Sequence, residues 1–294
     1  MLTGEILALL LAVFTGFIPI LIRKCTMKSD PKLGVFISLM GAPPLLFTGL
    51  VITGEWIHLI DLNYSGFLFF SLAGITHFLL GRTLHWYGIQ IVGASRAAVV
   101  ARSQIIFSPL LALIILAEGL GVTDIFAAVA VLIGAILISL STSEYKMVQK
   151  RGAVEGIVAS LSAAVLWGAS PIMIKLGLAQ INSPLIGTFI ASSVALLGYA
   201  ALMWGSNSYR ALFSLDRTTW YYIIGIALLS PAGILLRFAA LSDIPVVTFI
   251  VIASLGPLFT LFFSYIFIKR LELLNYKVGI ATVLMVVGAF VAVM

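Results

Sequence analysis

Charged residues are scarce in this chain. They make up only 10% of its 294 residues, while hydrophobic residues make up 62% and the mean hydropathy is +1.18. A water-soluble domain of this size cannot remove so much apolar surface from solvent, so the composition predicts a membrane protein. Cysteine is nearly absent as well, and the single Cys25 excludes an internal disulfide.

Residue types that carry catalysis or bind metals are also few. The three histidines are His58, His77 and His85, and no HExxH or GxSxG pattern occurs, so we expect no enzyme, no metal centre and no cofactor. Acidic residues fall near the ends of the apolar segments, which disfavours proton exchange driven by a membrane carboxylate. The net charge of +6 comes from basic residues scattered between apolar segments, so we expect no nucleic-acid partner.

The sequence repeats itself after 152 positions. Gly4–Ile22 aligns without a gap with Gly156–Ile174, and 8 of the 19 positions are identical. Farther on, Glu118-x15-Gly134 is matched by Glu272-x15-Gly288. We therefore divide the chain into a first repeat, a linker and a second repeat, at residues 1–142, 143–155 and 156–294.

Ten apolar stretches are long enough, or nearly so, to cross a hydrocarbon core of about 30 Å, which takes roughly 17–25 helical residues. They lie near residues 5–22, 33–53, 66–86, 94–116, 123–141, 156–176, 184–204, 220–240, 245–268 and 277–294. Because five is an odd number, two copies of a five-span unit must enter the membrane in opposite directions. The prediction is an all-α membrane protein of ten transmembrane helices, built as two inverted five-helix repeats. Many secondary transporters have this architecture, with the substrate site at the repeat interface.

The two sides of the predicted bundle differ in charge. If the side of the N-terminus is called side A, the loops and helix ends of the opposite side B hold 14 of the 17 basic residues, Arg82 among them. Cytoplasmic loops carry the excess of Lys and Arg, so side B is predicted to face the cytoplasm and both termini the outside. The linker 143–155 is then cytoplasmic, and we expect a multi-pass protein of the inner cell membrane.

Several short motifs follow one another in a recognisable order. The first repeat contains Gly93-Ala94-Ser95-Arg96-Ala97, Ser108-Pro109-Leu110-Leu111-Ala112 and Ala117-Glu118, and the second contains Pro257-Leu258-Phe259-Thr260, then Glu272 and Gly279 to Gly288. In these motifs the chain resembles the EamA-type transporters of the drug/metabolite transporter superfamily over nearly its whole length. The resemblance implies a carrier of small metabolites with a central cavity between its halves. It names no substrate, because the family includes carriers of amino acids, sugar phosphates and nucleotide sugars.

Arg102 is predicted to lie inside the fourth span. A charge at the centre of a membrane helix costs at least about 2.5–3.5 kcal/mol on insertion scales, so it is seldom without a role. One interpretation is an anion anchor that faces the cavity, with Ser103 and Gln104 adding hydrogen bonds. The other is an arginine that snorkels, or that bonds to backbone carbonyls freed near Pro109. The first is favoured because no span offers a buried carboxylate to neutralise Arg102.

The third span contributes two histidines. His77 and His85 are eight residues apart and project within about 80° of each other on a helix, so both can line one water-filled path. Histidines near the end of a span are also common at the membrane interface, and Arg82 and Trp86 fit such an interfacial belt.

Two residues of the second repeat are further candidates for contact with substrate. Arg237 in the eighth span is the counterpart of His85 at the 152-residue offset. Trp167 lies four residues before Pro171 and is predicted either to form a wall of the cavity or to pack against a neighbouring span.

Prolines fall inside several predicted spans. Proline removes a backbone donor and kinks a helix, and paired kinks would suit a carrier whose halves rock against each other. Kinks are equally common in helices that are merely packed together. The candidate hinge residues are Pro19, Pro109, Pro171, Pro231 and Pro257.

These observations predict a secondary transporter that moves a small polar metabolite, anionic or zwitterionic, by alternating access. An amino-acid exporter, with Arg102 holding the carboxylate, is the alternative. A membrane-embedded enzyme is disfavoured because the chain lacks the HExxH and GxSxG patterns. A non-transporting scaffold is disfavoured because it does not explain an arginine inside a span. The expected partners are the substrate and the lipid bilayer, and the protein is expected to be a monomer or a weak homodimer.

Overall fold

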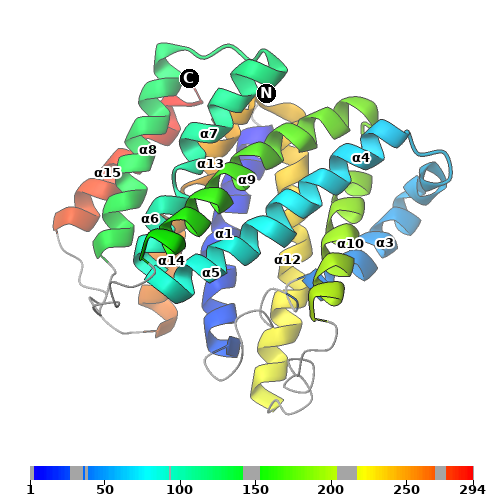
Figure 1. The fold of residues 1–294 in the computed structure, drawn as a ribbon, viewed down its shortest axis with the longest axis horizontal. Helices are drawn as coiled ribbons and strands as arrows, with labels where there is room; N and C mark the ends of the chain where they lie inside the picture. Colours follow the sequence, from blue (N-terminus) through cyan, green and yellow to red (C-terminus); the bar gives the residue numbers. More distant parts are fainter. Residues whose placement is uncertain are drawn as a thin grey trace.

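The fold is helical throughout the part of the chain that the structure describes. The computed structural model describes residues 3–26, 36, 39–92, 94–141, 153–203, 217–268 and 276–293, and no β-strand occurs in these ranges. The all-α prediction is therefore confirmed for them. The chain begins and ends at the same end of the helical bundle (Figure 1).

The helices of the first repeat include short 3₁₀ (η1) and π-helical (η2, η3) segments. They are α1 (Thr3–Thr26), α3 (Ala42–Thr53), η1 (Glu55–Leu59), α4 (Tyr64–Ala73), η2 (Gly74–Gly81), α5 (Arg82–Val92), α6 (Ala94–Ala101), α7 (Gln104–Leu111), η3 (Ala112–Leu116) and α8 (Val122–Ser141). The helices of the second repeat are α9 (Ala153–Gln180), α10 (Pro184–Met203), α12 (Arg217–Asp243), α13 (Val246–Ala253), α14 (Gly256–Ile268) and α15 (Tyr276–Val291).

Not every predicted span meets the length of a membrane helix. Within the described ranges, six helical segments are long and apolar enough to cross a membrane: Tyr64–Val92, Ala97–Leu116, Val154–Gln180, Pro184–Leu202, Trp220–Asp243 and Val246–Phe263. Four shorter apolar helices fall on the other predicted spans: Thr3–Ile18, Ala42–Thr53, Val122–Leu137 and Gly279–Val291. The total of ten spans stays a prediction, and parts of spans 33–53 and 277–294 lie outside the described residues.

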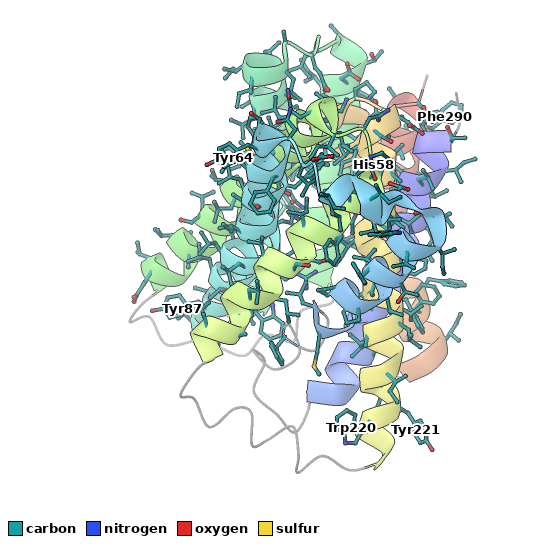
Figure 2. The ribbon with its side chains drawn as sticks, turned by 90° about the vertical axis from the view of Figure 1, so that its right-hand side faces the viewer. His58, Tyr64, Tyr87, Trp220, Tyr221 and Phe290 are labelled. Atoms are coloured by element: carbon teal, nitrogen blue, oxygen red, sulfur yellow. The ribbon has the colours of Figure 1, made fainter. Side chains whose placement is uncertain are left out.

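Large apolar side chains cover the outside of the bundle. Ile52, Ile114 and Val122 are 80%, 75% and 85% exposed. Side chains project outward along its whole height, with Tyr64 near one end and Trp220 and Tyr221 at the other (Figure 2). Aromatic residues with a polar edge are enriched at the two surfaces of a membrane, so this distribution fits a bundle surrounded by lipid.

The buried core lies between the two repeats. Phe70 of α4 is fully buried, and its ring centroid is 5.9 Å from that of Phe238 in α12. Gly177 of α9 and Gly187 of α10 make room for this ring, since a Cβ at Gly177 would lie 2.5 Å from it. A Cβ at this distance would overlap the Phe70 ring, and the close-packed interior leaves the ring no space to move. Residues larger than glycine are therefore excluded at these positions.

Contacts between the repeats are reciprocal. A Cβ at Gly16 of α1 would lie 2.4 Å from Phe259 Cβ, and one at Gly168 of α9 would lie 2.8 Å from Phe107 Cβ. Gly16 and Gly168 are 152 positions apart, and so are Phe107 and Phe259. The same close helix contact is thus made twice with the roles of the repeats exchanged, as a two-fold relation between them requires.

The fourth and ninth spans are interrupted at equivalent places. α6 ends at Ala101 and α7 begins at Gln104, while α13 ends at Ala253 and α14 begins at Gly256, 152 positions later in each case. At the first break the N–H of Ser103 donates to the carbonyl of Val100, three residues back, instead of the four residues of an α-helix.

Proline accounts for only one of the two breaks. Pro257 is the second residue of α14, where a missing N–H costs no helical hydrogen bond. Pro109 lies inside α7, seven residues beyond Arg102, and therefore does not cause the first break. The helices α1, α9 and α12 continue through Pro19, Pro171 and Pro231. A hinge role for these five prolines stays a prediction.

Candidate functional site

A cavity lies between the repeats. It consists of two adjoining compartments with volumes of about 240 and 280 Å³. Four residues line both compartments, and they come from four different helical segments: Thr15 from α1, His77 from η2, Trp167 from α9 and Arg237 from α12. Because both repeats contribute to this shared wall, the cavity lies at the repeat interface.

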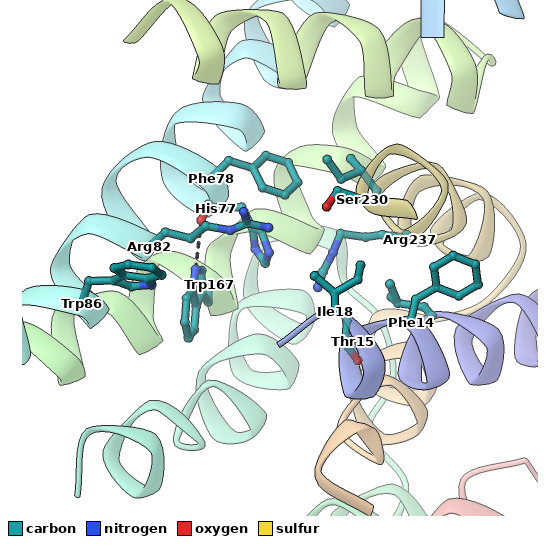
Figure 3. Close-up of a pocket in the computed structure, with 13 residues that line it drawn as sticks. Phe14, Thr15, Ile18, His77, Phe78, Arg82, Trp86, Trp167, Ser230 and Arg237 are labelled. Atoms are coloured by element: carbon teal, nitrogen blue, oxygen red, sulfur yellow. Dashed lines mark hydrogen bonds between the residues drawn. The ribbon is translucent and has the colours of Figure 1, made fainter. Parts of the chain in front are cut away.

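The first compartment is mainly apolar, and we call it the aromatic compartment. Besides the shared wall it is lined by Leu11, Phe14, Ile18, Phe78, Arg82, Trp86, Ser230, Gly233 and Ile234. Arg82 and Arg237 reach toward each other from opposite sides of this space, with Phe14 and Ile18 on α1 completing it (Figure 3).

The second compartment is mainly polar, and we call it the polar compartment. Besides the shared wall it is lined by His85, Ala98, Ala101, Arg102, Gln104, Ala253, Gly256, Pro257 and Thr260. Both helix breaks therefore face it: Arg102 sits within the first, and Gly256 directly follows the second. Helix interruptions at membrane depth are tolerated where they are buried in protein or line a cavity, which is the case here.

Residues that are equivalent between the repeats meet in this cavity but differ in chemistry. Thr15 corresponds to Trp167 and His85 to Arg237 at the 152-residue offset, and all four line the polar compartment. The backbone is thus repeated while the side chains are not. The two compartments therefore differ in their lining, one mainly apolar and one mainly polar, although arginines line both.

Trp167 is held in place by a hydrogen bond across the repeat interface. Its Nε1 donates to the carbonyl oxygen of His77 at 2.9 Å (Figure 3). The indole also lies against two imidazoles, with ring centroids 5.9 Å from His77 and 5.0 Å from His85. Gly81 leaves space for it, because a Cβ there would lie 2.5 Å from the indole Nε1.

Several polar atoms of the cavity wall are buried without a partner among the described residues. They are Nδ1 of His77, Nδ1 of His85 and Oγ of Ser230. Buried polar atoms are nearly always hydrogen-bonded, so these atoms mark places where a ligand or water would bind. His85 faces the polar compartment, Ser230 the aromatic compartment, and His77 lies between them.

The charge of the cavity is of one sign. Arg82, Arg102 and Arg237 all line it, and no Asp or Glu occurs among the lining residues within the described part of the chain. The guanidinium carbon of Arg82 lies 5.1 Å from the centroid of the Phe78 ring, and that of Arg237 lies 5.3 Å from Phe249. Stacking on an aromatic ring stabilises a cation modestly. Such a cavity attracts anions.

The structure brings most of the sequence-predicted site residues together. Six of the seven line the cavity: His77, His85, Arg102, Gln104, Trp167 and Arg237. Ser103 is not among the lining residues, and its hydroxyl donates to the carbonyl of Val100 at 2.7 Å.

Arg82 and Trp86 were assigned to an interfacial belt in the sequence analysis, as the alternative to contact with substrate. Both line the aromatic compartment. The predicted third span ended at residue 86, whereas the helical segment runs from Tyr64 to Val92, so Arg82 lies well inside it. Apolar lining residues such as Phe14, Ile18 and Ile234 were also missed, because nothing distinguishes them from lipid-facing neighbours in the sequence.

The comparisons with known proteins agree with this architecture. The sequence matches the EamA-like transporter family twice, over residues 2–140 and over residues 154–294. The chain therefore belongs to the EamA-like transporter family, a family of membrane transporters, and is a multi-pass membrane protein built of two repeats. The predicted family is confirmed.

A solved structure shares the fold. A crystal structure described only as that of a protein has a TM-score of 0.80 with this chain at 14% sequence identity, covering 99% of this chain and 97% of the other. At that identity the likeness concerns the fold alone. No curated protein matches the chain in sequence.

Proposed function

We propose that this protein is a secondary carrier that moves a small polar metabolite, anionic or zwitterionic, through the central cavity by alternating access. The observation that carries the proposal is the set of three arginines, Arg82, Arg102 and Arg237, around one cavity in which no described lining residue is a carboxylate. Membership of a transporter family supports the transport part of the proposal.

Placing arginine side chains inside a membrane protein costs free energy. A membrane-embedded cation is destabilising unless something compensates its charge, and such residues mark substrate or ion pathways. Among the described residues, neither Arg102 nor Arg237 forms an ion pair with a carboxylate. An anionic group in the cavity would supply the missing charge and would also accept the hydrogen bonds that planar guanidinium groups offer.

Alternating access is supported by the reciprocal packing of the repeats. Two inverted repeats can exchange conformations, so that the contacts of one side are adopted by the other. The interruptions at Arg102–Ser103 and Ser254–Leu255 lie at equivalent positions beside the cavity. We propose ten spans in the inner membrane, both termini outside, and a single chain as the functional unit, because one chain contains the whole cavity.

Reconstitution tests this proposal. Purified protein in liposomes should exchange labelled organic acids across the bilayer, and Arg102→Gln and Arg237→Gln should each lower the rate at least tenfold. His58→Gln is the control, since His58 is exposed in η1 outside the cavity lining. Chemical turnover of the labelled compounds without flux would favour a membrane enzyme instead. Flux unaffected by both arginine variants would remove the cavity from the transport path.

A further inference from the structure

The cavity is chemically divided, and the division defines its ligand more closely. We infer that the carried molecule is an amphipathic anion: one carboxylate attached to an apolar body of about the size of a branched aliphatic or aromatic side chain, with no ammonium group. The inference rests on the proposed function and adds the substrate class to it. Three features of the cavity support it, namely its apolar wall, its two joined compartments and its uniform charge.

The apolar wall is the first feature. Phe14, Ile18, Phe78, Trp86 and Ile234 line one compartment together with the ring of Trp167 (Figure 3). A ligand that consisted only of polar groups would lose its hydration against these side chains and gain no hydrogen bonds in return. An apolar group in the same place is removed from water, which is favourable.

The connection of the two compartments is the second feature. Each compartment alone lies below about 300 Å³, the lower end of the range for small-molecule sites. Arg237 and Trp167 belong to the walls of both. A ligand can therefore place its carboxylate beside Arg237 and Arg102 while its body extends past Trp167 into the aromatic compartment.

The polar compartment matches a carboxylate. Arg102 and Gln104 offer donors, and Nδ1 of His85 is buried there without a partner among the described residues. An imidazole with a free nitrogen can present an N–H to an anion. The carboxylate would meet these groups from one side and Arg237 from the other.

The uniform charge is the third feature, and it separates this ligand from an amino acid. A free ammonium group would share the cavity with Arg82, Arg102 and Arg237, and none of the lining residues that the structure describes is a carboxylate that could balance it. Like charges at this depth repel more strongly than in water, because the surroundings have a low dielectric constant. A 2-oxo acid should therefore bind better than the amino acid of the same shape.

A matched series of ligands tests the inference. Binding to the purified protein is measured by titration calorimetry for pyruvate, 4-methyl-2-oxopentanoate and phenylpyruvate, and for alanine, leucine and phenylalanine. We expect phenylpyruvate to bind roughly ten- to hundredfold more tightly than pyruvate, the factor that corresponds to burying a side chain of this size. Each 2-oxo acid should bind more tightly than its amino-acid counterpart.

Two variants test which compartment binds the apolar body of the ligand and which binds its carboxylate. Phe14→Ala should weaken binding of phenylpyruvate at least fivefold and leave pyruvate unchanged, while Arg102→Gln should weaken both. Leu10→Ala on the same helix is the control, because Leu10 is exposed on the outside of α1. Trp86→Ala provides a second test if Phe14→Ala does not fold.

The outcomes separate the inference from the proposed function. Equal affinity for pyruvate and phenylpyruvate, with both lost in Arg102→Gln, would overturn the amphipathic ligand and leave an anion carrier. Tighter binding of amino acids than of 2-oxo acids, again dependent on Arg102, would overturn the exclusion of ammonium and favour an amino-acid carrier. The inference would also be overturned if none of the six compounds bound detectably while the protein still transported anions in liposomes.

Discussion

Glu118 and Lys175 form an ion pair that joins the two repeats. Glu118 Oε1 lies 3.0 Å from Lys175 Nζ, and the other carboxylate oxygen accepts a hydrogen bond from the backbone N–H of Val246 at 2.8 Å. One carboxylate thus connects the end of the fourth span to α9 and to the first turn of α13. Both charged side chains are largely buried, with 24% and 16% of their surface exposed for Lys175 and Glu118.

Other polar contacts at the same end of the molecule also cross between the repeats. Each pairs a residue of the first repeat with one of the second: Thr3 with Asp243, Glu55 with Ser183, and Asn63 with Gln180. All lie on side A, the side of the N-terminus. Together with the Glu118 contacts they join the two repeats at this end of the molecule.

Loss of the Glu118 contact should open side A more often. Glu118→Gln removes a charge-assisted contact worth about 1–2 kcal/mol after allowance for partial exposure, so the population open on this side should rise roughly five- to thirtyfold. The measurement is the rate at which an impermeant thiol reagent, added outside cells, labels Ser230→Cys in a Cys25→Ser background. Ser230 is buried and lines the aromatic compartment.

Lys175→Gln should have the same effect, and the double variant should add little, since both changes remove one interaction. Unchanged labelling in both single variants would show that this ion pair does not contribute to closure.

Arg102 should bind the carboxylate by geometry as well as charge. Arg102→Lys keeps the charge but loses the planar fork, so some binding of phenylpyruvate should remain, whereas Arg102→Gln should lose roughly ten- to hundredfold, equivalent to about 1.5–3 kcal/mol. Affinity and thermal unfolding are measured on the same variants. If Arg102 instead stabilises the helix break, Arg102→Gln would lower the unfolding temperature and leave affinity unchanged.

The indole hydrogen bond of Trp167 should contribute to the shape of the cavity. Trp167→Phe keeps an aromatic ring but removes the bond from Nε1 to the His77 carbonyl. We expect a stability loss of about 0.6–1.7 kcal/mol, the range of side-chain hydrogen bonds within membrane proteins, and weaker ligand binding. Unfolding in detergent is followed by intrinsic fluorescence. Trp220→Phe, in the first turn of α12 and outside the cavity lining, is the matched control and should change neither quantity.

The proposed orientation is open to a direct test. In a Cys25→Ser background, a cysteine at Asn182 should react with an impermeant thiol reagent in intact cells, because Asn182 is exposed between α9 and α10 on side A. Cysteines at positions 143 and 208, which lie outside the described residues, should be shielded until the membrane is permeabilised. Strong labelling at position 143 in intact cells would reverse the orientation, since that linker contains three of the basic residues on which it rests.

The class of the protein and its two-repeat architecture follow from the sequence. Composition required a membrane protein, the 152-residue repeat predicted two similar halves, and the motifs identified the family. Arg102, His77, His85 and Arg237 could be selected because polar side chains are rare in apolar spans, and each must have a compensating environment.

The packing of the helices, in contrast, was needed to show which apolar side chains line the cavity and where Arg82 lies. Membrane helices are apolar on every face, so periodicity does not separate a cavity wall such as Phe14 or Ile18 from the lipid-facing Leu10 on the same helix. The third helical segment continues to Val92, beyond the predicted end at residue 86, and Arg82 lines the cavity. The break at Arg102–Ser103 is not at a proline, so no proline in the sequence predicts its position.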